Sequence, residues 1–552
     1  MSAENPIKGG EFIIKNTKPE NIFTPEEWSE EHKMIAQTCE EFIHKEVVPH
    51  LDRIDAMEDG LMPSLMEKAG ELGLLGLSVP EDLGGMGVDF KTSLLATGEW
   101  KAAYCLTEPS SGSDANSGKT KADLSDDGKH YTINGQKMWI TNGGFANLFT
   151  VFAKIEDDEN LTAFLVEADS EGITLNPEEK KMGIKGSSTR QVFFNNVKVP
   201  VENMLSERQN GFKIALNILN IGRIKLAAGV MGGAKGAITE SVKYANEREQ
   251  FGRPISKYGA IRYKLAEQVI YTYVVESATY RAGQNIDDAI QGLVASGMDK
   301  EKATLKGIEL FAPECAVLKV AGSECLDYVV DEAVQIYGGM GYSAESSVER
   351  AYRDSRINRI FEGTNEINRM LTVDMVLRRA MKGELDLMGP AMKVAGDLMS
   401  IPDIIEPSDT PLGNEEHMVD GFKKAILMVA GSAVQKLMQS LAKEQEVLMN
   451  IADMAIWTYL AESVYLRVQK KIDSQGEAAC EHDIAIAKTY FYDVADKIAK
   501  SAKDAINSYA EGDEARMMLM GLKRFTKTQP FNPKAARQTI AQKLIEDGRY
   551  KF

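Results

Sequence analysis

The sequence predicts a mostly helical α+β protein, in which one β-rich segment separates two helical parts. Strand-like alternation is confined to about residues 104–199, and helical periodicity fills most of the remainder. The 552 residues leave room for three or more domains. We expect a helical domain over residues 1–98, a β-domain over 99–205 and a helical domain over 206–385. A linker over 386–411 and a further helical domain over 412–552 complete the expected organisation.

Composition narrows the class of protein. Hydrophobic residues make up 43% and charged residues 26%, and the formal net charge is -18, which argues against wrapping nucleic acid. The five cysteines are scattered without CxxC spacing, so we expect a reducing compartment and no disulfide framework. The six histidines form no HxxxH or HxH pair, so we expect no metal site. The first residues do not resemble a signal peptide and no apolar stretch approaches the roughly 20 residues of a membrane span, so we expect a cytoplasmic protein.

The first helix is expected to begin near Thr24. Thr24 and Glu27 have the spacing of a capping box, and Pro25 stands at the first helical position. Phe23 and Trp28 are placed to form a hydrophobic staple. A second helical stretch is expected from about Pro63 to Leu75.

The β-domain is expected to be a compact sandwich or barrel. In HYTINGQKMWIT (His130 to Thr141), the pair Asn134-Gly135 between two alternating runs predicts a hairpin. Further strands are expected at Leu148 to Ile155, Thr162 to Ala168 and Gln191 to Val199.

Helical periodicity resumes after Phe212. The expected helices are Ile214 to Asn246, Ser256 to Tyr280, Ala312 to Gln335 and Asn365 to Met381. Three prolines between Ile401 and Pro411 predict a linker. The part beyond it is expected to form a separate small helical bundle.

Two segments of the β-domain are candidate cofactor contacts. YCLTEPSSGSD (Tyr104 to Asp114) ends in small and hydroxyl-bearing residues, which suit a phosphate or the polar rim of a flat ring, or simply form a loop between strands. In KMWITNGG, the ring of Trp139 and the hydroxyl of Thr141 can wall and bond a planar ring. The alternative is a core Trp of a barrel.

Two helix ends are candidates as well. Arg248, just before the turn at Phe251-Gly252, can clamp a pyrophosphate with two N–H groups, or can be a surface Arg that favours a helix C-terminus. The glycines of VQIYGGMGY (Val334 to Tyr342) allow a ligand to approach the backbone, although many helix ends carry glycine.

The candidate catalytic residue is Glu362, in RINRIFEGTNEINRM. Glu362 precedes Gly363, and Thr364 is placed to cap the following helix. A carboxylate on a tight turn beside Phe361 can face an apolar cleft as a general base. The alternative is a solvated Glu that a helix N-terminus favours.

These five segments occur together in the order of one family, and the chain resembles the acyl-CoA dehydrogenases, most closely their very-long-chain branch. YCLTEPSSGSD resembles the first family signature, and GGMGYSAESSVERAYRD followed by RIFEGTNEI resembles the second. KEQEVLMNIADMAIWTYLAES (Lys443 to Ser463) resembles the C-terminal extension of that branch. The resemblance covers nearly the whole chain. It implies a helical N-terminal domain, a middle β-barrel-like domain, a C-terminal four-helix bundle and an extra C-terminal helical domain.

The resemblance also implies a reaction. Glu362 would remove the α-proton of a fatty acyl-CoA and FAD would accept the β-hydrogen as hydride, giving a trans-2-enoyl-CoA in fatty-acid β-oxidation. Gly222 occupies the position from which some branches take the base, which favours Glu362. The residues implied for FAD are Tyr104, Leu106, Thr107, Gly112, Ser113, Trp139, Ile140, Thr141, Arg248, Phe251, Gln335, Gly338, Gly339, Thr364 and Glu366. Those implied for the substrate are Ser113, Asn220, Arg223 and Gly363.

The resemblance implies partners and leaves alternatives open. Electron-transferring flavoprotein would accept the electrons, and the chain would form a homodimer. The extension would associate with a membrane surface, which the acidic net charge does not favour. An acyl-CoA oxidase or monooxygenase on the same fold, and a scaffold or assembly protein that kept the fold, are the alternatives.

The chain departs from the family in two places. Between Gly87 and Glu99 it is shorter than its relatives, in a stretch that lines part of the acyl tunnel in the family, so chain-length preference is left open. Gln284 to Lys306 is an insertion between two core helices.

Overall fold

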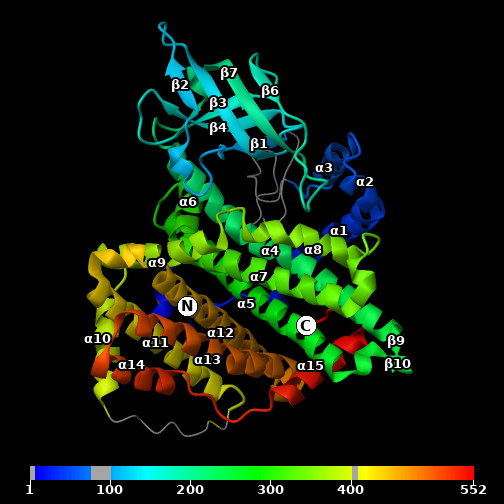
Figure 1. Cartoon of the computed structure of the whole chain (residues 1–552), viewed down its shortest axis with the longest axis vertical. Coiled ribbons are helices and arrows are strands. Elements are labelled where there is room, and N and C mark those ends of the chain that lie inside the picture. Colours follow the sequence, from blue (N-terminus) through cyan, green and yellow to red (C-terminus); the bar gives the residue numbers. More distant parts are fainter. Residues whose placement is uncertain (1–6, 76–100, 401–407, 409) are drawn as a thin grey trace. The chain divides into compact units, whose positions relative to one another are not determined.

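The computed structural model describes residues 7–75, 101–400, 408 and 410–552 (Figure 1). Its contacts divide the chain into two compact units. The β unit is Trp28–Leu219, and the helical unit is Met1–Glu27 together with Asn220–Phe552. The expected shortening between Gly87 and Glu99 lies outside the described residues, as does most of the expected linker from Ile401 to Pro411.

Short helices open the β unit. They are α1 (Glu30–Phe42), η4 (Ile43–Val47), η5 (Val48–His50), α2 (Leu51–Asp55) and α3 (Leu61–Glu71). The expected helix start near Thr24 is wrong, because the backbone N–H of Thr24 donates to Glu27 and the two residues close only the 3₁₀ turn η3 (Pro25–Glu27). The α-helix begins later, where Ser29 accepts the N–H of His32 in a capping box.

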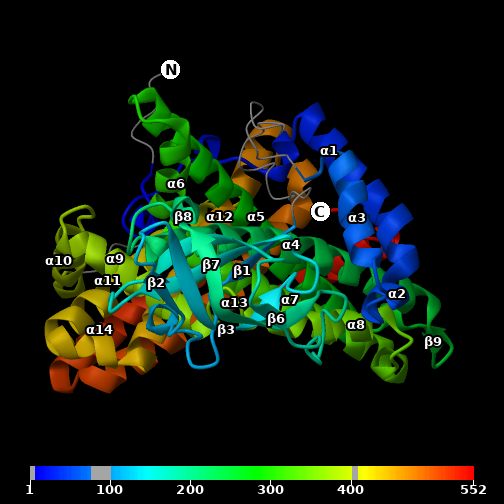
Figure 2. The same ribbon diagram turned by 90° about the horizontal axis from the view of Figure 1, so that it is seen from above.

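An eight-stranded sheet forms the rest of the β unit. Its main path runs β6-β7-β3-β2-β4-β5-β8, and β1 pairs in parallel with β4. Figure 2 shows β2, β3 and β7 next to one another in this sheet. The strands are β1 (Ala102–Cys105), β2 (Lys121–Leu124), β3 (His130–Thr141), β4 (Leu148–Ile155), β5 (Thr162–Glu167), β6 (Ile173–Leu175), β7 (Thr189–Pro200) and β8 (Met204–Leu205).

The expected hairpin at Asn134-Gly135 is wrong, because β3 is continuous through both residues. The side chain of Asn134 instead bonds Asn196 on β7, and the register of β3 against β7 shifts between Ile133 and Gly135. Gly135 lies against Thr120, whose hydroxyl would be 2.4 Å from an added Cβ. The glycine therefore serves a bulge and a close strand contact, not a turn.

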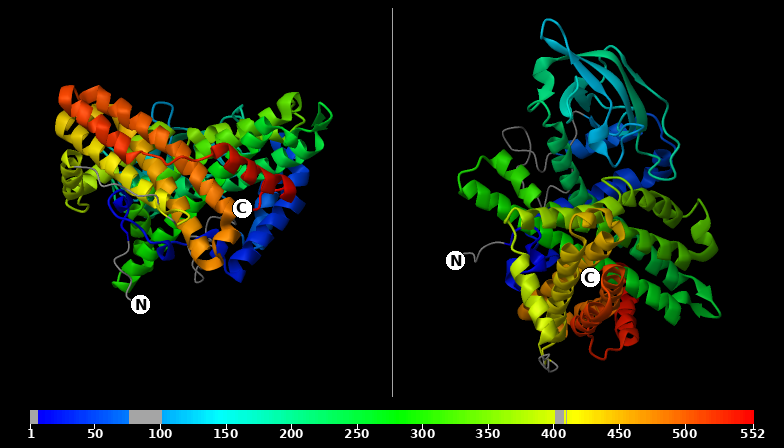
Figure 3. Two further views of the ribbon diagram at one scale, coloured as in Figure 1. Left: turned by 90° about the horizontal axis from the view of Figure 1, so that it is seen from below. Right: turned by 60° about the vertical axis from the view of Figure 1, so that its left-hand side comes forward.

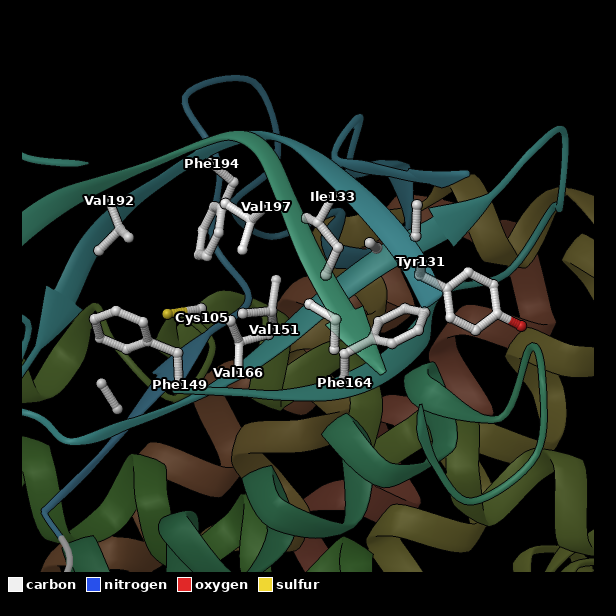
Figure 4. Close-up of a cluster of buried hydrophobic side chains, with 14 of the residues drawn as sticks. Cys105, Tyr131, Ile133, Phe149, Val151, Phe164, Val166, Val192, Phe194 and Val197 are labelled. Carbon is white, nitrogen blue, oxygen red and sulfur yellow. The ribbon is translucent and has the colours of Figure 1, made fainter. Parts of the chain in front are cut away.

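Alternating apolar residues of the strands fill the core of the β unit. Phe149, Val151 and Val166 from β4 and β5 face Val192 and Phe194 from β7 (Figure 4). The exposed fraction of these side chains is 0–1%. Burying each one contributes about 1.5–3 kcal/mol to folding. Strands from across the sheet thus share one apolar core, as the predicted compact β-domain requires.

The helical unit contains both long and short helices. They are α4 (Gly211–Glu247), α5 (Gly259–Ala295), α6 (Lys300–Leu310), α7 (Ala312–Tyr337), α8 (Ser347–Ser355), α9 (Asn365–Met381), α10 (Met388–Met399), α11 (Gly413–Leu437), α12 (Gln445–Gln475), α13 (Glu481–Tyr509), α14 (Gly512–Phe525) and α15 (Pro533–Asp547). Figure 3 shows α11 to α14, in yellow to red, running alongside one another. Helix α4 begins in the β unit and continues into the helical unit.

The C-terminal extension is not a separate bundle. Its helix α12 packs against α5 and α9, and α15 packs against α5. Buried ion pairs join Arg281 of α5 to Glu462 of α12 at 2.8 Å, and Arg467 of α12 to Glu276 of α5 at 3.0 Å. The first residues of the chain belong here too, because Glu26 pairs with Arg467 at 2.7 Å. Charges buried this deeply need such partners, so they tie the extension to the central helices.

Two other sequence expectations have structural outcomes. The insertion from Gln284 to Lys306 continues α5 and begins α6, and Gly307 packs against Ile290. Contrary to the expectation of no apolar span, α4 and the helical stretch Gly413–Lys443 are long and apolar enough to cross a membrane, by length and composition only. Core helices of globular proteins pass the same test, so this is weak evidence.

Candidate active site

A strained turn places Glu362 in the helical unit. It joins η11 (Arg356–Arg359) to α9. The backbone φ is 59° at Glu362 and 80° at Gly363, so both residues are left-handed. Glycine adopts this conformation freely, but it costs a residue with a Cβ roughly 1–2 kcal/mol. Strain of this kind persists where surrounding contacts hold it, and such places are often functional.

Two buried side chains hold the turn through its carbonyl groups. Asn368 of α9 donates to the carbonyls of Glu362, Gly363 and Thr364 at 3.3, 2.8 and 3.0 Å. Arg223 of α4 donates from Nε to the carbonyl of Glu362 at 3.2 Å, and Asn220 accepts from its Nη1 at 2.9 Å. Thr364 caps α9 by accepting the N–H of Ile367, as predicted. The turn is therefore fixed from both α4 and α9.

The carboxylate of Glu362 lies against Gly222 of α4. A Cβ added to Gly222 would be 2.6 Å from Oε2 of Glu362 and 2.9 Å from its Cδ. Any larger residue at position 222 would displace the carboxylate. The sequence identified Gly222 as unable to act as a base, and the structure shows that its lack of a side chain makes room for Glu362.

The charges around Glu362 act in opposite directions. Removal of the half-buried carboxyl from water raises its pKa, whereas the positive charges of Arg223 and Lys319 lower it. A raised pKa suits a general base, because the group must both bind and release a proton near the working pH. The carboxylate on this turn is therefore suited to accept a proton from a carbon atom of a bound molecule.

In the β unit, a bulge in β3 turns Trp139 outward. The register of β3 against β7 shifts between Lys137 and Ile140, and Trp139 has a φ of 60°. Lys137 and Ile140 are buried, while Trp139 is 53% exposed and Thr141 is also exposed. A bulge re-aims side chains in this way. The result is an exposed indole ring and, two residues further along the strand, an exposed threonine, which together suit a flat ring with a polar edge.

An ion pair fixes the first signature segment to this strand. Lys137 Nζ donates to Glu108 at 2.8 Å and to the carbonyls of Leu106 and Phe152. The N–H of Met138 also donates to the carbonyl of Thr107 at 2.9 Å. The backbone of Thr107 is thereby held beside β3, next to Met138, the residue that precedes Trp139.

The other predicted flavin contacts of the β unit divide into two groups. The side chains of Leu106 and Ile140 lie in the hydrophobic core, so only their backbones are available to a ligand. Tyr104 packs its ring edge against Phe152 at 5.1 Å. Gly112 and Ser113 are exposed, and a Cβ on Gly112 would meet nothing within 4 Å.

The predicted pyrophosphate contacts belong to the helical unit. Arg248 follows the end of α4 and is exposed. Phe251 and Gly252, with φ of 53° and 79°, form the two-residue turn between β9 (Glu249–Gln250) and β10 (Arg253–Pro254), and Phe251 is 95% exposed. An aromatic residue held outward on a left-handed turn fits contact with a ligand or another chain.

The glycine segment and the start of α9 supply the remaining candidates. Gln335 is exposed near the end of α7, and Gly338 and Gly339 follow in η10 (Gly338–Tyr342). A Cβ on either glycine would meet nothing within 4 Å, so their backbones are open to a ligand. Glu366 is exposed in the first turn of α9, where a hydrogen bond from its own backbone lowers its pKa. Thr364 is committed to its cap.

The sequence analysis missed three side chains that support Glu362. Asn368 holds the turn, Asn365 is the buried first residue of α9, and Lys319 of α7 donates to Asn365 Oδ1 at 2.8 Å. One signal was available for Lys319: a single lysine inside the apolar stretch CAVLKVAG. Asn220 and Arg223 were predicted for the substrate, and in the structure Arg223 bonds the carbonyl of Glu362 while Asn220 bonds Arg223. Their contact with substrate stays a prediction.

The fold and this turn define a class of protein: a largely helical protein with one β-domain and a half-buried carboxylate on a strained turn. Among the described residues, no group of three His, Cys, Asp or Glu side chains is placed to hold a metal ion.

Comparison with known proteins identifies the family. Models of the acyl-CoA dehydrogenase N-terminal domain match residues 29–116, those of the middle domain 103–197, and two of the C-terminal domain 209–377 and 421–524. A probable acyl-CoA dehydrogenase of Bacillus subtilis is 40% identical over 586 residues, covering 98% of each chain. The human mitochondrial very long-chain specific acyl-CoA dehydrogenase is 37% identical over 502 residues, covering 78% of this chain and 73% of that protein.

A solved structure gives the same answer. The crystal structure of acyl-CoA dehydrogenase complexed with FAD from Bacillus anthracis superposes with a TM-score of 0.95 at 43% identity, covering 99% of this chain and 100% of that one. The chain belongs to the acyl-CoA dehydrogenase family. The family and the fold class predicted from the motifs are thus confirmed.

Proposed function

We propose that this protein is an FAD-dependent dehydrogenase that oxidises acyl-CoA thioesters between their α- and β-carbons, with Glu362 as the base. One observation carries the assignment: Glu362 is held on a left-handed turn, half-buried, with its carboxylate against Gly222. A glutamate with only a surface role would not need four hydrogen bonds to the carbonyls of its own turn.

The residues of this turn have separate tasks. The carboxylate of Glu362 takes the α-proton, which is a very weak acid in a thioester. The backbone N–H of Glu362 donates to the thioester oxygen and stabilises the enolate-like charge. Arg223 and Asn368 hold the carbonyls of the turn, so that this N–H and the carboxylate keep their orientation. Partial desolvation raises the pKa of Glu362 toward the working pH.

Each of the two units, taken by itself, has residues that suit FAD. FAD, when bound, supplies the acceptor for the hydride that leaves the β-carbon. In the β unit, Trp139 and Thr141 would contact its ring system, with Thr107 and Ser113 nearby. In the helical unit, Arg248 and the backbone at Gly338 and Gly339 would contact the phosphates of FAD, bound either to the same subunit or to a second one. The exposed indole and the open glycine backbones support this assignment, and so does the FAD complex of the Bacillus anthracis relative.

We further propose a substrate length, a pathway, an electron acceptor, an oligomeric state and a location. We assign long-chain acyl-CoA and a place in fatty-acid β-oxidation, because of the human relative named for very long chains. Electron-transferring flavoprotein as acceptor, a homodimer and a cytoplasmic location follow from the family resemblance and the sequence. The outward-facing Phe251 agrees with contact to a second subunit.

The test uses Glu362→Gln, which keeps the size of the side chain and removes the base. The purified variant should carry flavin and bind acyl-CoA, yet its flavin absorbance should not bleach under anaerobic conditions. Wild-type protein, titrated with acyl-CoAs of increasing length, should bleach and reveal its chain-length preference. Normal bleaching of the variant would refute Glu362 as the base, and a wild-type protein that cannot hold flavin would refute the proposed function.

A further inference from the structure

Lys319 is a buried cation that the proposed reaction has not yet used. It lies in α7 with an exposed fraction of 0%. Its Nζ donates to Asn365 Oδ1 at 2.8 Å, and the same oxygen accepts from Ser323 at 3.2 Å. Asn365 opens α9, two residues after Gly363. Lys319 therefore reaches the catalytic turn from below through one buried amide.

The charges around Lys319 show which way it acts. On Glu362, the positive charges are Arg223 from α4 and Lys319 from α7, and both lower its pKa against the effect of desolvation. On Lys319, burial and Arg223 lower the pKa to about 8, while Glu362, Glu366 and Glu324 raise it. An ammonium group that is expensive to bury and sits beside another cation needs a reason to be there.

Lys319 and Arg223 differ in their hydrogen-bond partners and in how their charge depends on pH. Arg223 bonds the turn carbonyl and Asn220, and guanidinium stays charged at any working pH. Lys319 donates to the neutral amide of Asn365, so its positive charge is available to the nearby carboxylate. A full positive charge in a desolvated region acts strongly, because little water screens it.

We propose that Lys319 is a positioning residue for the catalytic base, which anchors Asn365 at the start of α9 and supplies the positive charge that keeps Glu362 ionised between turnovers. The inference rests on the proposed role of Glu362. Without this charge, a desolvated carboxylate would hold its proton and could not accept another from the substrate. With it, Glu362 stays an available base at neutral pH.

The experiment reads the protonation of Glu362 directly in substrate-free protein. The carbonyl stretch of a protonated carboxylic acid is followed by infrared difference spectroscopy across a pH titration, and the band that is absent in Glu362→Gln is assigned to Glu362. In Lys319→Met the midpoint of this band should rise by about one pH unit or more, since a nearby opposite charge shifts a carboxyl by roughly 1–3 units. The acid limb of the flavin-bleaching rate should move upward by the same amount.

Ser323→Ala is the matched control. It also removes a hydrogen bond to Asn365 Oδ1, but it leaves the charge of Lys319 in place. Its midpoint should stay at the wild-type value, and that of Lys319→Arg should do so as well. A shift in Ser323→Ala as large as in Lys319→Met would mean that the hydrogen bond and not the charge matters, and would overturn the proposal.

Lys319→Gln guards against misfolding, because it keeps an amide donor toward Asn365 and removes only the charge. An unshifted midpoint in either charge-removing variant overturns the proposal. Loss of folding in both places Lys319 among the residues that hold the fold, and overturns it equally. Bleaching of flavin by Glu362→Gln would refute the base assignment instead, while the titration would still report whether Lys319 acts on this carboxyl.

Discussion

Gly222→Ala tests most directly whether the contact between Gly222 and Glu362 positions the carboxylate of the proposed base. The substitution adds one methyl group, yet that Cβ would lie 2.6 Å from Oε2, 2.9 Å from Cδ and 3.1 Å from Oε1 of Glu362. Carbon atoms do not approach oxygen this closely, so the carboxylate must move by several tenths of an ångström to about 1 Å. The turn itself cannot follow easily, because Arg223 and Asn368 hold its carbonyls.

The expected loss follows from the size of this displacement. A shift of about 1 Å in a reacting group can lower the rate about 10²-fold, which corresponds to roughly 3 kcal/mol in the activation free energy. Global stability should not fall in parallel, because replacing glycine by alanine inside a helix contributes about 1 kcal/mol. Loss of activity without loss of stability is the expected signature.

The assay is anaerobic stopped-flow bleaching of the flavin in a single turnover, together with chemical denaturation. Gly229→Ala is the matched control, since it lies on the same helix and its added Cβ would meet nothing within 4 Å. Gly229→Ala should bleach at the wild-type rate, and Gly222→Ala about 100-fold more slowly. Equal rates for the two variants would mean that the carboxylate does not rest on Gly222 when it reacts.

Two further predictions concern stability. Burial raises the pKa of Glu314 to about 7, and its Oε1 accepts the N–H of Gly10 at 2.7 Å. An unfolded chain releases this proton near pH 4.5, so the folded state binds more protons between pH 4.5 and 7, and the free energy of unfolding should fall as pH rises through that window. Glu314→Gln should not show this decrease, which amounts to about 3 kcal/mol in the free energy of unfolding at pH 8. Denaturation of both proteins at pH 5 and pH 8 measures the difference, and equal pH dependence in both would contradict the prediction. In the β unit, Lys137→Met should destabilise the fold by about 3–5 kcal/mol, because it leaves Glu108 buried without its cationic partner. The double variant with Glu108→Leu should recover much of that stability, as measured by urea denaturation. No recovery would show that the ion pair is not the cause.

Local sequence determined much of the fold. The helix Asn365–Met381 has the predicted bounds, because its cap at Thr364 is encoded in neighbouring residues. The strand Leu148–Ile155 has the predicted bounds as well, because alternation of apolar residues is a local property. The ordered motifs were sufficient to indicate the family and to select Glu362.

Tertiary structure decided what local patterns could not. Asn134-Gly135 reads as a turn in isolation, yet contacts with Asn196 and Thr120 make it a bulge within one strand. The capping pair Thr24 and Glu27 forms its hydrogen bond but closes only a 3₁₀ turn, and Glu26 between them pairs with Arg467, 441 residues away.

The catalytic turn shows the same division. The sequence by itself determined that a glutamate precedes a glycine and a helix cap. Only the folded chain brought Arg223, 139 residues away, to the carbonyl of Glu362, placed Gly222 against its carboxylate and bonded Lys319 to Asn365 at the start of α9. The physical reason is that a carboxylate acquires its pKa and orientation from desolvation and from neighbouring charges, and those neighbours come from helices far apart in the chain.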